Sequence, residues 1–289
     1  MNVDGLIVVD KPGGMTSHDV VARIRRLAKT RRVGHGGTLD PMATGVLVVG
    51  VNRATRLLGH LMLTEKAYDA TVRLGVTTTT DDAEGEVVAT ADTSGLGEAD
   101  VHAALRAFVG DIEQVPTAVS AIKVDGKRAY QRVRDGEAVD LPARPVTVHE
   151  LVPGPLRTAE GVAELDVVLR CSSGTYVRAI ARDAGALLGT GAHLTALRRT
   201  AVGPFGLDQA HTLERLEESF VVLPIAEAAR AAFPALDLDV QRAAEVRVGR
   251  KLALTLPAPG PVALFAPDGE FLALYEQAGE LARAVAVFV

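Results

Sequence analysis

"KAYDATVRLG", residues 66–75, alternates between apolar and polar side chains over most of its length. Successive side chains of a strand point to opposite faces of the sheet, so this period predicts a β-strand with one buried face. The buried face would carry Tyr68, Ala70, Val72 and Leu74, and the other face Asp69, Thr71 and Arg73. The sequence therefore directs the Tyr68 side chain toward the protein interior.

The segments on either side of this strand predict the fold class. Apolar runs at 5–9 and 45–51 indicate short buried strands, and the pattern of residues 16–28 indicates a helix that Thr16 or Ser17 caps. We expect further helices at 54–62, 97–110, 127–136 and 175–189, the last opened by Ser173 or Thr175, and further strands at 119–124, 144–152 and 162–171. Hairpins and single helices are mixed in this order, which predicts an α+β (mixed α/β) fold with a largely antiparallel or mixed sheet.

A change of pattern near Phe233–Pro234 suggests a domain boundary. An acidic helical stretch, 213–232, precedes it, and the residues that follow contain short apolar runs separated by the turn signals "PAPGP" and "PDGE". Such a pattern is typical of a small β-barrel-like module. We therefore expect a domain of residues 1–232 followed by a small β-rich domain of residues 233–289.

Composition narrows the class of protein. The 289 residues are 48% hydrophobic, which is enough for a substantial core. The single cysteine, Cys171, excludes a disulfide framework and a zinc site built from thiolates. The N-terminus lacks the pattern of a signal peptide, and no apolar run has the length of a transmembrane helix. We expect a cytoplasmic protein with no membrane association.

The charge distribution is uneven along the chain. A net charge of -5 argues against binding to nucleic acid, but residues 1–60 hold nine Lys and Arg against four Asp and Glu, and residues 206–289 hold seven against twelve. Basic clusters occur at 23–32 and at 123–134, the second with Tyr130 inside it. A solvated helix face is the common explanation for one such cluster, whereas two of them modestly favour a polyanionic partner.

Several chemistries find no support in the motifs. The chain has no nucleotide-binding P-loop and no H-E-x-x-H zinc motif, and we expect no metal. "HGG" at 35–37 is similar to the oxyanion loop of esterases, but no G-x-S-x-G elbow supplies a nucleophile. A glycosidase needs two carboxylates, and Asp81, Asp82 or Glu84 would offer the second, although the composition of 80–86 predicts a hairpin turn.

The remaining candidate is Asp40, in "GHGGTLDPMATG". Pro41 disfavours helical angles at the preceding residue, so Asp40 is held extended with its side chain in a defined direction. The glycines at 34, 36 and 37 leave the backbone open to a ligand. An aspartate before proline is also a common turn or helix cap, and the local chemistry by itself favours that interpretation.

Five motifs, in this order, resemble the bacterial tRNA pseudouridine synthase B family. They lie at 10–26, 34–51, 66–87, 114–137 and 171–205, and the resemblance covers about residues 4–205. A weaker resemblance links 235–252 to the PUA-type RNA-binding module that follows the catalytic domain in this family. One departure is Gly36, where family members commonly carry Thr or Ser.

The resemblance implies a reaction and a partner. Uridine 55 in the T-loop of tRNA is isomerised to pseudouridine: the N1–C1′ bond breaks, the base turns, and it rejoins through C5. The base must first leave its stack and enter a pocket. The family needs no cofactor and no metal. The resemblance also leads us to expect the T stem-loop of tRNA as substrate, and a monomer with no obligatory protein partner.

The resemblance also assigns residues to roles. Asp40 matches the catalytic aspartate, and Arg178 matches the arginine that keeps it ionised. Whether the aspartate attacks C1′ or C6, or assists elimination to a glycal, stays open. Tyr68 matches the tyrosine that stacks on the base and takes the C5 proton. Core packing for Tyr68 and a surface position for Arg178, beside Arg182, are the alternatives.

Further binding residues rest almost wholly on the resemblance. Tyr176 and Leu197 match residues that line the uracil pocket, and His35 matches the histidine that fills the space left by the flipped nucleotide. Lys123 and the arginines of 23–32 are candidates for phosphate contacts, and Lys11 and Pro12 match a structural motif near the cleft. RNA of this kind is recognised by shape and backbone contacts.

Two other function classes stay open at this point. A non-catalytic protein that binds or folds tRNA would share the basic clusters. A carboxylate-dependent hydrolase would cleave a glycosidic bond and release a free base or sugar. Release of label from C5-tritiated uridine with the RNA chain left intact separates these classes.

Overall fold

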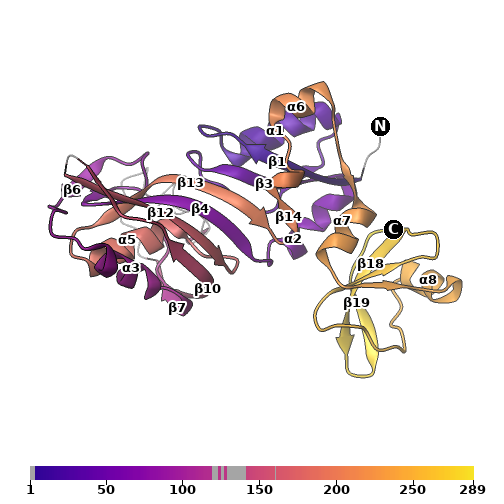
Figure 1. The fold of residues 1–289 in the computed structure, drawn as a ribbon. Helices are drawn as coiled ribbons and strands as arrows, with labels where there is room; N and C mark the ends of the chain where they lie inside the picture. The colour runs from indigo at the N-terminus through magenta and orange to yellow at the C-terminus, as the bar shows by residue number, and fades with distance from the viewer. Residues whose placement is uncertain (1–3, 119–122, 125–126, 129–140, 160) are drawn as a thin grey trace.

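The computed structural model describes residues 4–118, 123–124, 127–128, 141–159 and 161–289. Within these residues, an 11-stranded sheet forms the larger part of the molecule (Figure 1). Its strands are β1 (Gly5–Lys11), β2 (Val33–His35), β3 (Thr44–Val51), β4 (Lys66–Leu74), β7 (Gly110–Gln114), β10 (Arg144–Pro153), β11 (Arg157–Ala159), β12 (Val162–Cys171), β13 (Ala192–Val202), β14 (Phe205–Gly206) and β15 (Leu223–Pro224).

The order of the main strands is β15-β1-β3-β13-β4-β12-β10-β7. All neighbours in this path are antiparallel except β13 and β3, which share a short parallel pairing of Arg198 with Thr44 and Arg199 with Gly45. The expected mixed, largely antiparallel sheet is confirmed. The strand at its centre, β4, is the one whose alternation is clearest in the sequence, and Tyr68 is buried as expected.

Helices cover different parts of the sheet. In Figure 1, α1 (Ser17–Ala28) and α6 (Leu213–Glu218) lie near β1 and β3, whereas α3 (Glu98–Arg106) and α5 (Val177–Leu187) lie near β10 and β13. α1 begins as the sequence predicts: the Thr16 hydroxyl accepts from the Asp19 amide, and the Asp19 carboxylate accepts from the Thr16 amide. This reciprocal cap leaves Val20 and Ile24 buried against the core.

Two helix predictions differ from the structure in their bounds. The stretch 54–62 is divided between a 3₁₀ turn, η1 (Asn52–Arg56), and a single helical turn, α2 (Leu58–Leu61). α5 begins at Val177 with Tyr176 as its first flanking residue, and not at Ser173 or Thr175. The physical reason is that the Gln114 side chain, from a distant strand, accepts from the Tyr176 amide at 2.8 Å.

The stretch 119–136 lies largely outside the described residues. Lys127–Arg128 form a strand, β9, paired with β8 (Lys123–Val124), so the helix prediction for 127–136 is wrong at its start. The Asp-Gly sequence at 125–126 favours a two-residue hairpin connection, which the helix prediction overlooked. By contrast, the turn predicted at 80–86 does connect two paired strands, β5 (Val76–Thr78) and β6 (Val87–Thr90).

The C-terminal residues form a second, four-stranded sheet. Its strands are β16 (Ala235–Asp237), β17 (Val262–Phe265), β18 (Phe271–Ala278) and β19 (Leu281–Val287), with α8 (Val240–Arg247) beside them and α7 (Ile225–Ala232) before them (Figure 1). Phe265, Phe271 and Phe288 share an apolar cluster with Leu6 and Val48 of the large sheet. The expected β-rich C-terminal module is present, and its boundary at 232/233 stays a prediction.

One further element completes the described structure. A second 3₁₀ turn, η2 (Leu207–Gln209), follows β14. Over the described ranges, no helix combines the length and the apolar character that crossing a membrane requires.

Gly45, where β3 meets β13, is expected to tolerate no side chain. Its φ is +97°, and a Cβ there would lie 2.2 Å from the Arg199 carbonyl oxygen. We expect Gly45→Ala to lower the free energy of unfolding by on the order of 2–4 kcal/mol, measured by urea denaturation. Gly59→Ala is the control: nothing lies within 4 Å of its added Cβ, and we expect a change within about 1 kcal/mol. Equal effects of the two substitutions would contradict this account of the β3–β13 junction.

Candidate active site

A cavity of about 280 Å³ opens where β4 and β13 meet the loop before β3 and the start of α5. Its described lining residues are Gly37, Thr38, Leu39, Asp40, Met62, Lys66, Tyr68, Ser173, Gly174, Thr175, Tyr176, Val177, Arg178, Leu197 and Arg199. Five of the residues selected from the sequence are in this set: Asp40, Tyr68, Tyr176, Arg178 and Leu197. They come from four separate parts of the chain, and the fold brings them to one hollow.

The loop that carries Asp40 is held on both sides. The Ser17 hydroxyl, at the start of α1, accepts from the Leu39 amide and donates to the Leu39 carbonyl. The Lys11 ammonium, at the end of β1, donates to the Pro41 carbonyl at 3.1 Å. The residues before and after Asp40 are thus anchored through their backbones, and about a third of the Asp40 side chain remains exposed, to the cavity.

Arg178 lies between two carboxylates. Its Nε is 3.0 Å from Oδ2 of Asp40, and its Nη1 is 3.3 Å from Oδ2 of Asp82. The same Nη1 donates to the Thr80 carbonyl at 2.7 Å. Only 4% of the Arg178 side chain is exposed. Its planar guanidinium contacts the 80–82 turn on one side and directs its Nε at Asp40 on the other.

Burial and charge act in opposite directions on Asp40. Burial raises the pKa of its carboxyl above the ordinary aspartate value, and the nearby Asp82 carboxylate adds to the rise. The charge and hydrogen bond of Arg178 lower the pKa, as does the charge of Lys11, but burial is the largest effect. Arg178 therefore limits a rise in pKa that burial would otherwise make larger.

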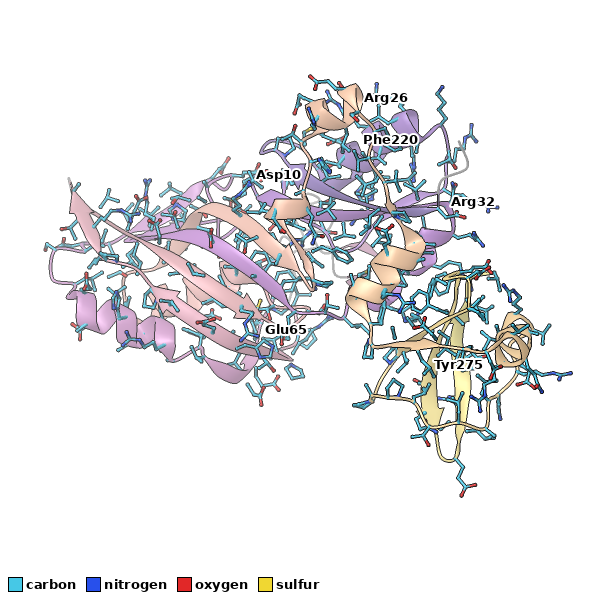
Figure 2. All side chains as sticks on the ribbon, turned by 45° about the vertical axis from the view of Figure 1, so that its right-hand side comes forward. Asp10, Arg26, Arg32, Glu65, Phe220 and Tyr275 are labelled. Atoms are coloured by element: carbon cyan, nitrogen blue, oxygen red, sulfur yellow. The ribbon has the colours of Figure 1, made fainter. Side chains whose placement is uncertain are left out.

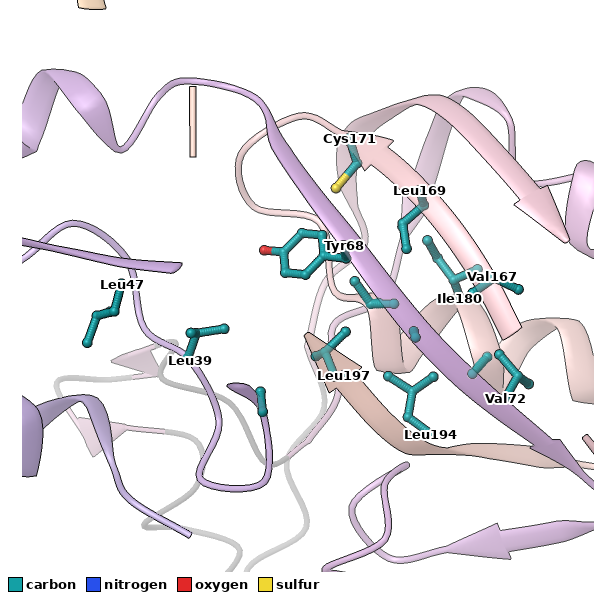
Figure 3. Packing of buried hydrophobic residues seen from close by; sticks show 14 of the residues in the cluster. Leu39, Leu47, Tyr68, Val72, Val167, Leu169, Cys171, Ile180, Leu194 and Leu197 are labelled. Carbon is teal, nitrogen blue, oxygen red and sulfur yellow. The ribbon is translucent and has the colours of Figure 1, made fainter. Parts of the chain in front are cut away.

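Tyr68 faces the cavity from β4. Its residue is 7% exposed, and Figure 3 shows its hydroxyl directed toward the segment that carries Leu39 and Leu47. Burial raises the pKa of the phenol, and the charge and hydrogen bond of Arg199 oppose this rise. The Tyr68 side chain thus packs in the core and also lines the cavity.

The opposite wall is set by the start of α5. The Gln114 side chain accepts from the Tyr176 amide at 2.8 Å and donates to the Tyr176 carbonyl at 3.1 Å. These two bonds fix the backbone immediately before Arg178. Leu197, on β13, adds an apolar surface, so the cavity offers both flat aromatic and aliphatic walls.

Two lysines lie buried around the cavity with lowered pKa values. Burial lowers the pKa of Lys11 to about 8, with the charge of Asp40 opposing it. Burial also lowers the pKa of Lys66 to about 8, and the charge of Arg199 adds to this. Each ammonium is held by backbone carbonyls: Lys11 by Pro12, Met15 and Pro41, and Lys66 by Met62 and Thr64.

Other residues selected from the sequence lie apart from this hollow or outside the description. His35, in β2, packs edge to face with His18 at 5.5 Å between ring centroids and is not among the described lining residues. Lys123 belongs to β8, but its side chain, like Tyr130, lies outside the described residues. In the 23–32 cluster, Arg26 and Arg32 are exposed (Figure 2).

Several residues that shape the site do not stand out in the sequence. The pattern of 80–86 makes Asp82 a candidate hydrolase carboxylate or a turn residue, whereas in the structure it pairs with Arg178 behind the cavity wall. Asp40 is the only carboxylate among the described lining residues, so the cavity lacks the facing pair of a glycosidase there. Gln114, Lys66 and Arg199 lie inside the motifs that carry the family resemblance. Their position in those motifs is the only feature of the sequence that could have identified them.

Family models match the chain from residue 25 to its end. The description "TruB family pseudouridylate synthase (N terminal domain)" matches residues 25–177. "tRNA pseudouridylate synthase B C-terminal domain" matches 178–231, and "tRNA Pseudouridine synthase II, C terminal" matches 233–289.

Relatives of known name match almost the whole chain. The tRNA pseudouridine synthase B of Streptomyces griseus is 58% identical over 99% of this chain and 97% of its own length. The tRNA pseudouridine synthase B of Thermobifida fusca is 56% identical over 99% of this chain and 98% of its own length. Among solved structures, a Cbf5-Nop10-Gar1 complex contains a chain with TM-score 0.73 and 26% identity, covering 99% of this chain and 85% of that one.

The pKa of Asp40 tests the ion pair directly. Because Arg178 lowers this pKa, we expect Arg178→Gln to raise it further. The measurement is a ¹³C NMR titration of side-chain carboxyls, with the Asp40 signal assigned by its loss in Asp40→Asn. Arg182→Gln, one turn further along α5, should leave the titration unchanged because Arg182 pairs with Asp81 and Asp183. An unshifted Asp40 titration in Arg178→Gln would rule out this coupling.

Proposed function

The chain belongs to the TruB family of pseudouridylate synthases, and we propose that it isomerises uridine 55 to pseudouridine in the T-loop of tRNA. The observation that carries the proposal is one carboxylate, Asp40, held by a buried guanidinium at the mouth of a cavity that Tyr68 also lines. A base turned out of its stack enters this cavity and meets the carboxylate.

The cavity has the size and the walls for one extruded base. Its volume of about 280 Å³ is close to the lower end, about 300 Å³, of small-molecule sites. Tyr68 supplies an aromatic face for stacking, and Leu197 and Tyr176 supply the remaining wall. Gly174 and Thr175 border the same space, and we propose that their backbone groups form hydrogen bonds with the edge of the base.

Asp40 carries the chemistry in every route open to this reaction. Attack on C1′, attack on C6 and assisted elimination each begin from an ionised carboxylate. Entry of the base removes water from the cavity and raises the cost of that charge, whereas the Nε of Arg178 stays 3.0 Å away to stabilise it. After the N1–C1′ bond breaks, the same walls hold the detached base while it turns to present C5.

Tyr68 is the group placed for the final step. Formation of the C5–C1′ bond leaves a proton on C5, and removal of this proton restores the ring. In our proposal, Tyr68 first loses its hydroxyl proton to solvent and then accepts the C5 proton as the phenolate, a form that the charge of Arg199 favours by opposing the rise in pKa that burial causes. No cofactor and no metal takes part in the proposed reaction.

RNA binding is proposed to use surfaces beyond the cavity. The exposed arginines of the 23–32 cluster and Lys123 contact phosphates, His35 occupies the space left by the flipped nucleotide, and the β-rich C-terminal module binds RNA as a PUA-type domain. Such contacts make affinity fall steeply with salt. The enzyme is proposed to act as a cytoplasmic monomer without an obligatory protein partner.

Asp40→Asn tests the site. We expect release of tritium from C5-labelled T-loop RNA to fall by at least about 10³-fold, because the ionised carboxylate is lost while the side-chain shape is kept. RNA affinity and the unfolding transition should stay close to those of the wild type.

Asp69→Asn, on the exposed face of β4, is the matched control and should release label at the normal rate. Normal release by Asp40→Asn would refute the assignment of the site. A wild-type protein that binds the RNA without releasing label would instead be a non-catalytic binder, and a free base or sugar among the products would indicate a hydrolase.

The pH dependence of the single-turnover rate follows from the raised pKa of Asp40. As pH falls, Asp40 takes up a proton and the ionised fraction needed for attack declines. Because burial raises the pKa, we expect the acid limb of the rate to have its midpoint above about 3.9, the ordinary aspartate value. Rates measured from pH 4 to 8 on short T-loop RNA check this, and a rate undiminished down to pH 4 would contradict it.

A further inference from the structure

Arg199 is a buried cation whose contacts join several elements of the site. Only 1% of the residue is exposed. Its Nε donates to the Val46 carbonyl of β3 at 2.7 Å, its Nη2 to the Gly37 carbonyl at 3.2 Å, and its Nη1 to the Thr38 carbonyl at 3.4 Å. One guanidinium therefore spans from β13 to β3 and to the turn that leads into Asp40.

This arrangement is unusual for a buried arginine. Over the described ranges, no carboxylate lies within ion-pair distance of Arg199, and its hydrogen-bond partners are neutral groups. Burying an ion without a counter-charge costs about several kcal/mol even after relaxation. An apolar residue would avoid this cost but would leave the three carbonyls without their donor, so the arginine is explained by the contacts that it makes.

Arg199 also faces Tyr68. The two residues are directly opposed in the β13–β4 ladder, and both line the cavity. Directly opposed side chains of neighbouring strands lie within contact distance, and the charge of the guanidinium lowers the pKa of the phenol. Arg199 is thus the side chain that touches both the aromatic wall of the cavity and the turn before Asp40.

We propose that Arg199 is a positioning residue that holds the Tyr68 hydroxyl and the Gly37–Thr38 turn in one fixed arrangement. The separation between the stacking ring and the Asp40 carboxylate then stays constant when the base enters. The inference rests on the proposed function, because it assigns Arg199 a part in the same reaction. Arg199 itself acts through Tyr68 and the turn.

The planar fork of arginine suits this task, and lysine does not replace it. Arg199 directs nitrogen atoms to three carbonyls that lie on two different segments. A lysine keeps the charge but has one nitrogen and a different reach, so it leaves some of these carbonyls without their donor. The substitution Arg199→Lys therefore removes the positioning contacts and keeps the charge.

The first test compares Arg199→Lys with Arg198→Lys. Arg198 is the neighbouring residue on β13, and its side chain instead pairs with Asp10 at 2.8 and 3.0 Å. Single-turnover kinetics on C5-tritiated T-loop RNA should show a rate constant lowered by about 10–100-fold for Arg199→Lys, since small misplacements of reacting groups have this effect. The RNA Kd should change by less than about threefold, and Arg198→Lys should keep the wild-type rate within the same factor.

The second test observes Tyr68 without RNA or turnover. The chain has four tyrosines, so ¹³Cζ-tyrosine labelling produces four signals, and Tyr68→Phe identifies that of Tyr68. We expect Arg199→Lys to move this signal and leave the other three in place, while Arg198→Lys moves none. Because this test needs no activity, it stands even if the wild-type protein releases no tritium, a result that would refute the proposed function alone.

A double-mutant cycle covers the case in which Arg199→Lys also lowers stability. If Arg199 acts in part through Tyr68, the rate loss caused by Arg199→Lys should be smaller in a Tyr68→Phe background than in the wild type. Full additivity of the two substitutions, together with an unmoved Tyr68 signal, would overturn the proposal. So would an RNA affinity that falls in parallel with the rate, because it would make Arg199 a binding residue.

Discussion

The site depends on the guanidinium of Arg178, which lies between Asp82 and Asp40. A carboxylate on a cavity wall is expensive to ionise, and burial does raise the pKa of Asp40. The compensating cation must therefore be close and unable to move away. Asp82 and the Thr80 carbonyl hold one side of the guanidinium at 3.3 and 2.7 Å, so its other edge remains directed at Asp40. Because Asp82 lies outside the cavity lining, the residue that orients the cation does not compete for substrate.

The fold supplies this arrangement from distant parts of the chain. β4 and β13 form the floor, the loop between β2 and β3 brings Asp40 to one edge, and α5 brings Arg178 to the other. Each edge is fixed through its backbone: Ser17 and Lys11 hold the residues around Asp40, and Gln114 holds Tyr176. In the proposed site, Asp40 and Arg178 therefore lie on anchored segments, and entry of a base need not order them first.

Local sequence patterns predicted those features that local forces determine. The alternation of β4 places Tyr68 on the buried face, and the choice of Thr16 or Ser17 as the cap of α1 agrees with the Thr16 cap of the structure. α5 begins later than the sequence predicts, and the residue before it, Tyr176, is held by Gln114, 62 residues earlier in the chain. The partners of Arg178 and Arg199 are equally remote, and only the family resemblance pointed to the pairing of Arg178 with Asp40. Long-range contacts of this kind leave no period or spacing in the sequence.

The most direct measurement is a structure of the protein with a T-loop RNA that carries 5-fluorouridine at the target position, where the absence of a C5 proton blocks the last step. We predict that the modified base lies out of its stack, inside the cavity against Tyr68, with its sugar or ring carbon beside the Asp40 carboxylate and Arg178 still bridging Asp40 and Asp82. A complex in which the base stays stacked in the RNA, or lies on another surface with Asp40 turned away from it, would contradict the account.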